Sequence, residues 1–483
     1  MNLTSQDYQV LAPYILLTAW ACVLLLVDLF IPKERKSVTA LLAALGLAVT
    51  LGVTLSQVGI EQVGFFNMAA LDGFSTFVNA LLLVSGILGI ALAHGYVKRM
   101  GIERGEYYTL LLFSVSGMML MAQATDLIIV FIALELLSIP LYVLAAFARP
   151  QLSSEEAGMK YFLLGAFATG FVVYGTALVF GATGTTSLAG IVAAAASPST
   201  STLLLTIGAA LVLVGFGFKV AAVPFHMWTP DVYQGAPTAV TAFMASGAKI
   251  AGFAALLRVF ATAFPALAVD MTAVLWALAA LTMIVGNVIA ISQTDIKRML
   301  AYSSIAHAGY ILMAFVPYGN PAVRDVSIAA GLFYLVAYAF TNFGAWGVVI
   351  ALEKKEEKGL AIADYAGLGR KHPLLAAAMT VFMLSLVGLP PTLGLVGKVY
   401  LFRAVIAGGF TGLAIIGVLT SLISAYYYLR VVVTMYMKEG EPETVRETWL
   451  SLTTALTAIV TVVFSLLPQS LFEWASTAVL KLF

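Results

Sequence analysis

The sequence predicts an all-α polytopic membrane protein, with about fourteen transmembrane helices and two inverted five-helix repeats that each contain a broken helix. The first observation is composition: of 483 residues, 61% are hydrophobic and only 10% are charged. Mean hydropathy is +1.00, whereas an ordinary soluble domain is about a quarter charged. The second is a series of apolar runs of about 20 residues with short loops between them. The third is that two of these runs hold helix breakers beside a lysine.

Charge and cysteine content exclude several classes of function. The net charge of +1 gives no reason to expect a nucleic-acid partner. The single cysteine, Cys22, excludes an internal disulfide and any multi-cysteine zinc or iron–sulfur site. The chain contains neither the G-x-G-x-x-G nor the G-x-x-x-x-G-K-[ST] nucleotide-binding pattern. We therefore expect no cofactor and no metal in this chain, and any redox chemistry to reside on other chains.

The apolar runs define the expected spans in chain order. They fall near 10–31, 37–57, 71–97, 107–122, 126–147, 158–181, 203–226, 237–260, 268–291, 298–317, 326–351, 373–403, 409–437 and 448–478. The first run is too long for a signal sequence and no basic segment precedes it, so we expect it to stay as a helix. The expected units are three N-terminal helices (1–106), a first five-helix repeat (107–262), a second, inverted repeat (263–438) and a C-terminal helix (439–483).

The distribution of basic residues over alternate loops predicts orientation. One set of loops holds most of them, namely Lys33, Arg35, Lys36, Lys98, Arg99, Arg104, Arg149, Lys297, Arg298, Lys354, Lys355, Lys358, Arg370, Lys371, Lys438 and Arg446. The other set holds only Arg324 and Arg403, with Arg258 and Lys481 at helix ends on that side; Lys481 lies outside the residues that the structure describes. We therefore expect the basic loops in the cytoplasm and both termini on the periplasmic side of a bacterial inner membrane.

The chain is organised around the stretch from Leu211 to Lys249, where two lysines lie inside apolar runs. A lysine at bilayer depth costs roughly 2.5–3.5 kcal/mol, so it needs a partner or a water path. Gly215, Gly217 and Pro224 are helix breakers around Lys219, and broken backbone at membrane depth is tolerated only where protein or a cavity covers it. This combination predicts an ion path.

A short set of ionisable side chains remains at membrane depth after loops and helix ends are removed. The set is Glu135, Lys160, Lys219, Lys249, His307 and Lys398. Glu135 lies about 9 residues, or ~14 Å, into its helix, and Pro140 should loosen the turn beside it. A carboxylate and an ammonium at similar depth stabilise each other's charge. We expect Glu135 to pair with Lys219, with Lys160, or with both.

The second half repeats this arrangement with little residue identity. Val387-Gly388-Leu389-Pro390-Pro391, followed by Gly394, Gly397 and Lys398, predicts a second broken helix with one lysine. Interrupted helices in corresponding halves are typical of inverted-repeat transporters. Each half has an odd number of spans, which forces opposite orientations.

Structural explanations compete with these functional ones. Lys160 could extend to the interface beside Glu155 and Glu156 instead of acting in a relay. Lys219, Lys249 and Lys398 could form fixed ion pairs that only hold helices together.

The histidines and one aromatic run leave similar alternatives. His226 could hydrogen-bond a carbonyl at the cytoplasmic end of its helix or admit protons, and His307, among Tyr302, Ser303 and Ser304, is a relay candidate. Tyr426-Tyr427-Tyr428 is simplest as an interfacial aromatic anchor.

Three segments carry a family resemblance: GFGFKVAAVPFHMWTPDVYQGAPT, SQTDIKRMLAYSSIAHAGYIL and MLSLVGLPPTLGLVGKVYLF. They resemble the signature segments of the proton-translocating subunits of respiratory complex I, which are similar to Mrp-type cation/proton antiporters. The resemblance extends from Leu71 to Val431, and HMWTPDVYQGAP is its most specific part. Two features distinguish this chain from other members of the family. One related subunit usually has glutamate at the position of Lys398, and the largest related subunit has a long lateral helix for which this chain has no residues left.

The resemblance implies roles for individual residues. Glu135 resembles the helix-five glutamate, Lys219 the lysine of broken helix seven, Lys249 the helix-eight lysine and Lys398 the lysine of broken helix twelve. Lys160 and His307 resemble accessory relay positions. The implied activity is proton translocation driven by quinone reduction elsewhere in the complex, with NADH, FMN, iron–sulfur clusters and quinone on other subunits. The implied partners are the lipid bilayer and other complex I membrane-arm subunits.

Three alternatives stay open at this point. One is an Mrp-type cation/proton antiporter subunit driven by an ion gradient, and another is the plastoquinone-type photosynthetic homologue. The third is a scaffold subunit whose polar axis is purely structural. The sequence also leaves proton or sodium open as the transported ion, although an ammonium group cannot coordinate a metal cation as carboxylates and carbonyls do.

Overall fold

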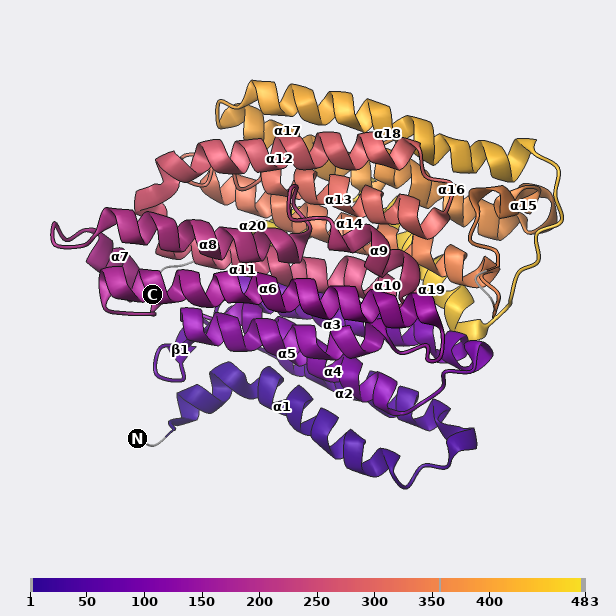
Figure 1. Cartoon of the computed structure of the whole chain (residues 1–483), viewed down its shortest axis with the longest axis horizontal. Helices are drawn as coiled ribbons and strands as arrows, with labels where there is room; N and C mark the ends of the chain where they lie inside the picture. Colours follow the sequence, from indigo (N-terminus) through magenta and orange to yellow (C-terminus); the bar gives the residue numbers. More distant parts are fainter. Residues whose placement is uncertain (1–2, 356–357, 479–483) are drawn as a thin grey trace.

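The computed structural model describes residues 3–355 and 358–478, and most of this chain is helical. The helices run roughly along the long axis of the molecule (Figure 1). Within the described ranges, 11 helices are long and apolar enough to cross a bilayer. They are α1 (Ser5–Asp28), α2 (Ser37–Ser56), α3 (Gly73–Met100), α5 (Leu127–Ala145), α6 (Leu152–Thr183), α8 (Thr202–Val220), the run Thr238–Ala263, the run Pro265–Ile291, α14 (Arg324–Leu352), α18 (Thr411–Met437) and α19 (Thr448–Leu466). The expected all-α polytopic membrane fold is confirmed.

The remaining elements are shorter or less apolar. The run Thr238–Ala263 consists of α10 (Thr238–Phe243), a π-helical segment η2 (Met244–Ala248) and α11 (Lys249–Ala263). The run Pro265–Ile291 consists of η3 (Pro265–Leu267) and α12 (Ala268–Ile291). The others are α4 (Glu106–Gln123), α7 (Leu188–Ala195), α9 (Trp228–Gly235), α13 (Ile296–Met313), α15 (Leu368–Lys371), α16 (Pro373–Val387), α17 (Leu393–Ala407), α20 (Gln469–Thr477), and the 3-10 turns η1 (Lys33–Arg35) and η5 (Ile362–Tyr365).

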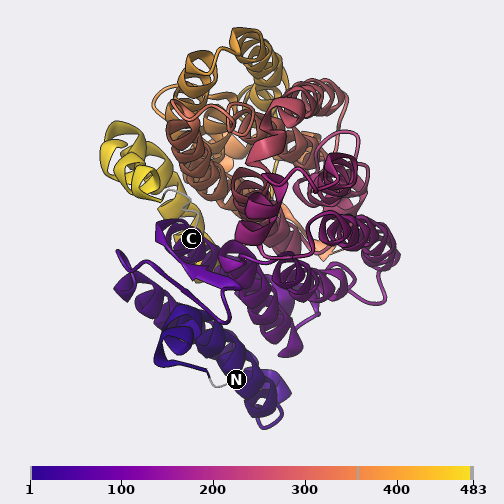
Figure 2. The same ribbon diagram turned by 90° about the vertical axis from the view of Figure 1, so that its left-hand side faces the viewer.

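Burial separates central from peripheral helices. The most apolar window of Thr238–Ala263 is 100% buried, that of α14 is 94% buried, and those of α6 and α19 are only 28% buried. Seen end-on, α1 and α2 lie at one edge of the bundle and the C-terminal helices at another (Figure 2). The central helices are those that contribute Lys249, Tyr334 and Tyr338 to the interior.

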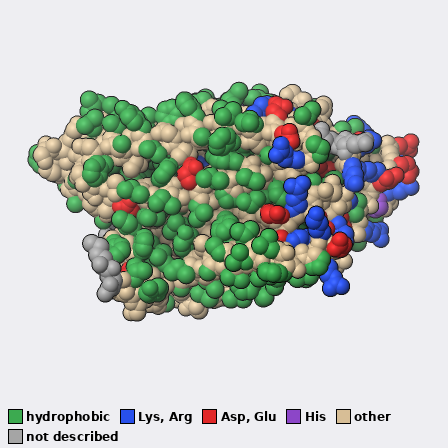
Figure 3. All heavy atoms as spheres, turned by 60° about the horizontal axis from the view of Figure 1, so that its bottom comes forward, with side chains coloured by type: hydrophobic (Ala, Val, Ile, Leu, Met, Phe, Trp, Pro, Cys, Tyr) green, Lys and Arg blue, Asp and Glu red, His purple; other side chains and the backbone are tan. Residues whose placement is uncertain are grey.

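Charged side chains gather at one end of the molecule, whereas hydrophobic side chains cover most of the rest of the face shown in Figure 3. The charged end contains α15 and the loop that follows α18, and α1 begins at the opposite end (Figure 1). An apolar belt with charge concentrated beyond one edge is the surface expected of a membrane protein with basic loops on one side.

Both broken helices are present where the breakers predict them. The expected span 203–226 ends at Val220, because Ala221 adopts a left-handed conformation (φ 62°), and α9 begins only at Trp228. The expected span 373–403 is divided between α16 and α17, with Gly388 (φ 88°) directly after α16. The expected single C-terminal helix is instead two helices, since Pro468 separates α19 from α20. Pro140, in contrast, lies within a continuous α5.

Two short backbone pairings have the same form in the two halves of the chain. Thr125–Leu127 pairs with Thr186–Leu188 through hydrogen bonds from the Leu127 amide to the Thr186 carbonyl (3.0 Å) and from the Leu188 amide to the Thr125 carbonyl (2.9 Å). Thr294–Ile296 pairs with Leu360–Ile362 through the equivalent bonds, at 2.8 and 2.9 Å. In both, an aspartate at the centre caps the following helix, α5 or α13.

A β-hairpin was not expected from the sequence. Strands β1 (Gln62–Gly64) and β2 (Ala69–Leu71) pair antiparallel with Val63 opposite Ala70. The turn between them includes Phe65, Phe66 and Asn67 at positive φ, a conformation that phenylalanine rarely adopts. The turn was not predicted because none of these residues is a glycine, the residue that usually marks such a conformation.

Candidate functional site

Lys219 ends the first half of the broken helix and lies in the interior. Its exposed fraction is 5%, and its ammonium donates to the Ser138 hydroxyl at 2.7 Å and to the Tyr161 hydroxyl at 3.4 Å. The amide of Ala222 returns to the Gly217 carbonyl at 2.8 Å, which closes the end of α8 as in a Schellman motif. The helix break therefore fixes the last turn of α8 against α5 and α6.

Glu135 is half-buried on α5, one turn before Ser138. Its carboxylate accepts a hydrogen bond from Thr169 on α6 at 2.7 Å. Glu135 and Lys219 interact electrostatically, but within the described residues neither Lys219 nor Lys160 forms a direct ion pair with Glu135. The expected pairing of Glu135 with Lys219 is therefore an electrostatic interaction without a direct ion pair, and Lys160 pairs with other carboxylates. Ser138 lies three residues after Glu135, on the same face of α5, and accepts the hydrogen bond from the Lys219 ammonium.

Lys160 belongs to a different cluster, nearer the charged end. Its side chain is 41% exposed and its ammonium pairs with Glu156 at 2.6 Å and with Asp231 at 2.8 Å. Arg298 also pairs with Asp231, at 2.8 Å. Burial raises the pKa of Asp231, but these two cations outweigh burial and hold that pKa below its ordinary value. Lys160 thus lies in a half-exposed ion network.

Aromatic rings connect the surroundings of Lys219 with helix α13 in the second half of the chain. The Tyr161 ring stacks on Trp228 at 4.6 Å, and Trp228 contacts Tyr233 edge-on at 5.9 Å. The Tyr233 hydroxyl in turn lies near Ser304 on α13. Since Trp228 and Tyr233 both belong to α9, the second piece of the broken helix spans the distance between the two clusters.

Lys249 follows the π-helical segment directly and is 2% exposed. Its ammonium donates to both the hydroxyl and the backbone carbonyl of Ser304. The Tyr338 hydroxyl donates to the same Ser304 hydroxyl at 2.9 Å. Ser304 is therefore shared by a buried ammonium and a phenol.

His307 lies one turn further along α13 and is 3% exposed. Its Nδ1 shares a hydrogen bond with the Tyr334 hydroxyl at 2.8 Å, and its Nε2 shares one with the Tyr428 hydroxyl at 3.2 Å. The Tyr428 hydroxyl also contacts Ser303. A ring with a hydroxyl on each nitrogen can take a proton on one side and release one on the other.

Lys398 lies at the second helix break and is 2% exposed. Its ammonium donates to the carbonyls of Leu386 (3.0 Å) and Val387 (2.8 Å) and to the Ser421 hydroxyl (2.6 Å). These carbonyls end α16, where the helix dipole is negative and carbonyls lack helical partners. A Cβ on Gly388 would lie 2.8 Å from the Lys398 side chain, so glycine is needed there for space as well as for its φ.

His226 lies in the loop between α8 and α9 with an exposed fraction of 7%. Its Nδ1 has no hydrogen-bond partner within the described residues. It contacts none of the three buried lysines through a hydrogen bond described here.

Sequence reasoning missed several members of the site. Tyr428 was expected to be an interfacial anchor, and this was wrong, because Tyr427 and Tyr428 are fully buried and only Tyr426 is exposed. Tyr427 donates to Asn287 on α12 at 2.9 Å. The helical period could have separated these neighbours, since Ser424 and Val431 share the buried face of α18.

Arg258 was expected at a helix end and instead forms a fully buried ion pair with Asp72, with each side chain 1% exposed. No group of three His, Cys, Asp or Glu side chains that could hold a metal ion occurs in the described part of the chain.

Comparison with known proteins identifies relatives. The family model described as "NADH:quinone oxidoreductase/Mrp antiporter, TM" matches residues 124–424. A protein of Trichlorobacter lovleyi named NADH-quinone oxidoreductase subunit N is 48% identical over 465 residues, which cover 96% of this chain and 94% of that protein.

Two solved structures share the fold. A chain of respiratory complex I from Thermus thermophilus with bound aureothin is 36% identical, with a TM-score of 0.81, and the match covers 96% of this chain and 99% of that one. A chain of the Mrp complex from Dietzia sp. is 21% identical with a TM-score of 0.84, covering 97% of each chain. At that identity the likeness to the Mrp chain concerns the fold alone.

Proposed function

The chain belongs to the NADH:quinone oxidoreductase/Mrp antiporter family of transmembrane proteins, and we propose that it is the proton-translocating subunit N of a bacterial NADH:quinone oxidoreductase. One observation carries the proposal. Lys219, Lys249 and Lys398 are each 5% exposed or less, and within the described residues their hydrogen-bond partners are hydroxyls and carbonyls, never carboxylates. Buried amines without a fixed counter-ion can exchange protons.

The hydroxyl partners are suited to this exchange. Ser138 accepts from Lys219 while it donates to the Leu134 carbonyl. A hydroxyl can donate in one direction and accept from the other by rotation, so it can serve either protonation state of the amine. Ser304 accepts from Lys249, and Ser421 accepts from Lys398, as Ser138 does from Lys219.

The charge on Glu135 controls the protonation of the Lys219 amine. Glu135 lies beyond direct ion-pair contact with Lys219, and a unit charge at about 6 Å is worth about 2.8 kcal/mol at an effective dielectric of 20, which changes a protonation equilibrium by about 10²-fold. When a signal from the redox reaction moves the carboxylate away from Lys219, its proton passes to Lys249. The path continues through Ser304 and His307 to Lys398. Lys160 and His226 act on the cytoplasmic side of this path.

Two inverted repeats and fourteen crossings are part of the proposal. The 11 long helices together with α4, α13 and the α16–α17 pair give that number. The matching pairings centred on Asp126 and Asp295 support the repeats, because each follows the first helix of its unit. In this register Glu135 and Ser304 correspond, each nine residues after its aspartate. The units are 107–262 and 263–438, flanked by 1–106 and 439–483, and both termini are periplasmic.

Electron transfer takes place on other subunits in this proposal. NADH, FMN, iron–sulfur clusters and quinone are bound there, and neighbouring antiporter-like and small membrane-arm subunits contact this chain. The 48% and 36% identities to proteins of NADH:quinone oxidoreductases support this assignment over an Mrp-type antiporter, where the likeness is 21%. Identifying the proteins that co-purify with the chain distinguishes this assignment from the plastoquinone-type homologue.

The test is Lys219→Ala in the assembled enzyme. We expect loss of proton pumping and depressed quinone-coupled turnover, with assembly retained. Lys438→Ala, which changes an exposed lysine outside the buried set, is the control and should pump normally. An assembled Lys219→Ala enzyme with an unchanged proton-to-electron ratio would support the scaffold alternative and contradict the proposal.

A further inference from the structure

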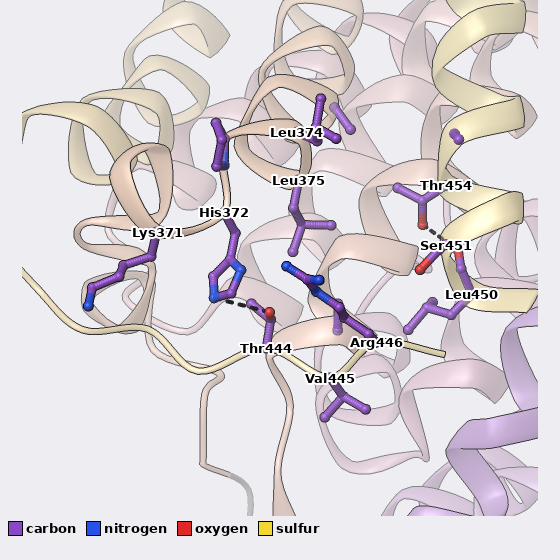
Figure 4. A pocket seen from close by; sticks show the side chains of 14 residues that line it. Lys371, His372, Leu374, Leu375, Thr444, Val445, Arg446, Leu450, Ser451 and Thr454 are labelled. Atoms are coloured by element: carbon purple, nitrogen blue, oxygen red, sulfur yellow. Dashed lines mark hydrogen bonds between the residues drawn. The ribbon is translucent and has the colours of Figure 1, made fainter. Parts of the chain in front are cut away.

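A cavity of about 510 Å³ lies at the charged end of the molecule, away from the buried lysines. It is bounded by the first turns of α16 and α19, the end of α14 and the segment that precedes α19. Figure 4 shows Arg446 reaching toward Leu375 across this space, with His372 and Thr444 joined by a hydrogen bond at one side.

The lining divides into a polar and an apolar part. Lys371, His372, Thr444, Arg446 and Ser451 provide the polar groups, and the lining contains no aspartate or glutamate. Leu374, Leu375, Ala378, Leu450 and Ala455 lie on the following turns of α16 and α19 and are apolar. A ligand with an anionic end and a hydrocarbon end matches both parts.

Arg446 is the positively charged group of the lining that could bind an anionic ligand. The segment around it is otherwise paired: Glu441 binds Lys371, Glu443 binds Lys354, and Glu447 binds Arg99. Among the residues that line the cavity, Arg446 is the one arginine or lysine without an acidic partner within the described part of the chain. Its guanidinium is therefore available to an external anion.

The backbone adds to this preference. Both α16 and α19 begin at the cavity and direct the positive ends of their helix dipoles toward it. Free first-turn amides come mainly from α19, because α16 begins with Pro373 and its Leu375 amide donates to the His372 carbonyl. Trp449, at the start of α19, is 46% exposed, and an exposed tryptophan at a helix end is typical of the headgroup level of a bilayer. Leu374, which lines the cavity, is 87% exposed, which suits contact with acyl chains.

We infer that this cavity is a binding site for one anionic phospholipid of the cytoplasmic leaflet. The phosphate binds Arg446 and His372, with Lys371 at the rim, and an acyl chain lies along Leu375, Ala378 and Leu450. Basic pockets between transmembrane helices on the cytoplasmic side bind such headgroups. The site is separate from the proton path, so loss of lipid binding and loss of pumping are distinguishable.

The experiment reconstitutes the assembled complex in vesicles that contain phosphatidylglycerol with a photoactivatable acyl chain. After illumination, labelled peptides of this chain are identified by mass spectrometry. We expect labelling of residues 371–378 and 446–455. Photoactivatable phosphatidylcholine, which has the same phosphate but no net charge, should label them much less, and added inorganic phosphate should not compete.

Variants assign the effect to the cavity. Arg446→Gln should reduce labelling about fivefold, the effect of one arginine near a membrane surface, whereas Lys438→Gln, in the same segment but outside the lining, should not. Leu375→Trp keeps every charge, fills the apolar part and should also reduce labelling. Equal labelling by both lipids, unchanged labelling in Arg446→Gln, or protection of both peptides by a neighbouring subunit would each overturn the inference.

Discussion

The buried ion pair between Asp72 and Arg258 allows a quantitative prediction about stability. The guanidinium donates to both carboxylate oxygens, at 2.9 and 2.8 Å, and to the Ala122 carbonyl at 2.7 Å. Asp72 also caps α3 by accepting from the Ser75 amide at 2.7 Å. In Arg258→Met the carboxylate keeps its cap but loses its counter-ion in a site where each partner is 1% exposed.

The expected cost follows from that burial. Removing one partner of a buried ion pair costs about 3–5 kcal/mol, because the remaining charge is neither solvated nor paired. This corresponds to roughly 150- to 5,000-fold in the equilibrium between folded and unfolded chain. The double variant Asp72→Asn/Arg258→Met has no charge left, and asparagine is also a good cap. It should therefore be more stable than Arg258→Met alone.

The assay heats membranes in steps and measures, on native gels, how much of this subunit stays in the assembled complex. Arg324→Met is the matched control, since Arg324 pairs with Asp325 at the surface with side chains 36% and 50% exposed, and such pairs contribute about 0–1 kcal/mol. An Arg258→Met complex that dissociates at the same temperature as the control would refute the reasoning. So would a double variant less stable than Arg258→Met.

Three further predictions concern the interior. A Cβ at Gly117 would lie 2.4 Å from a backbone nitrogen of α5, so Gly117→Ala should displace α5 and lower pumping measured in vesicles, whereas Gly170→Ala, with open space around it, should not. Tyr428→Phe should slow pumping without loss of assembly, because His307 loses a hydroxyl at Nε2; normal pumping would place the path elsewhere. Burial raises the pKa of Glu353 above its ordinary value of 4.5, so ionisation costs stability as pH rises from that value through the raised pKa. Glu353→Gln should flatten this dependence of the dissociation temperature on pH.

The parts of the structure that depend on local chemistry were predictable from the sequence. A lysine beside glycines and a proline marks a helix that stops at membrane depth, and Lys219 and Lys398 both lie at such breaks. The burial of Lys249 and His307 also follows from sequence, because charged groups avoid lipid. These features involve a few neighbouring residues, so no knowledge of helix packing is needed.

The parts that depend on which helix faces meet were not predictable. Asp72 and Arg258 are separated by 186 residues, and counting from the loops placed Arg258 at a helix end. Glu135 was expected to pair with an ammonium; its carboxylate accepts a hydrogen bond from Thr169, and the Lys219 ammonium donates to Ser138. Serines and threonines are common in membrane helices, so their identity gives little sign of which of them contacts a charge.

The π-helical segment η2 determines the direction in which the Lys249 side chain points. In a regular helix each residue advances by about 100°, and a π turn adds one residue without completing an extra turn. Every side chain after Ala248 is therefore rotated by about 100° from the position that a helical wheel drawn from Thr238 would assign. A homologue with one residue fewer between 244 and 248 and a regular helix there would direct the same ammonium at the same neighbour. A homologue that keeps the residue count but lacks the π turn would direct it elsewhere.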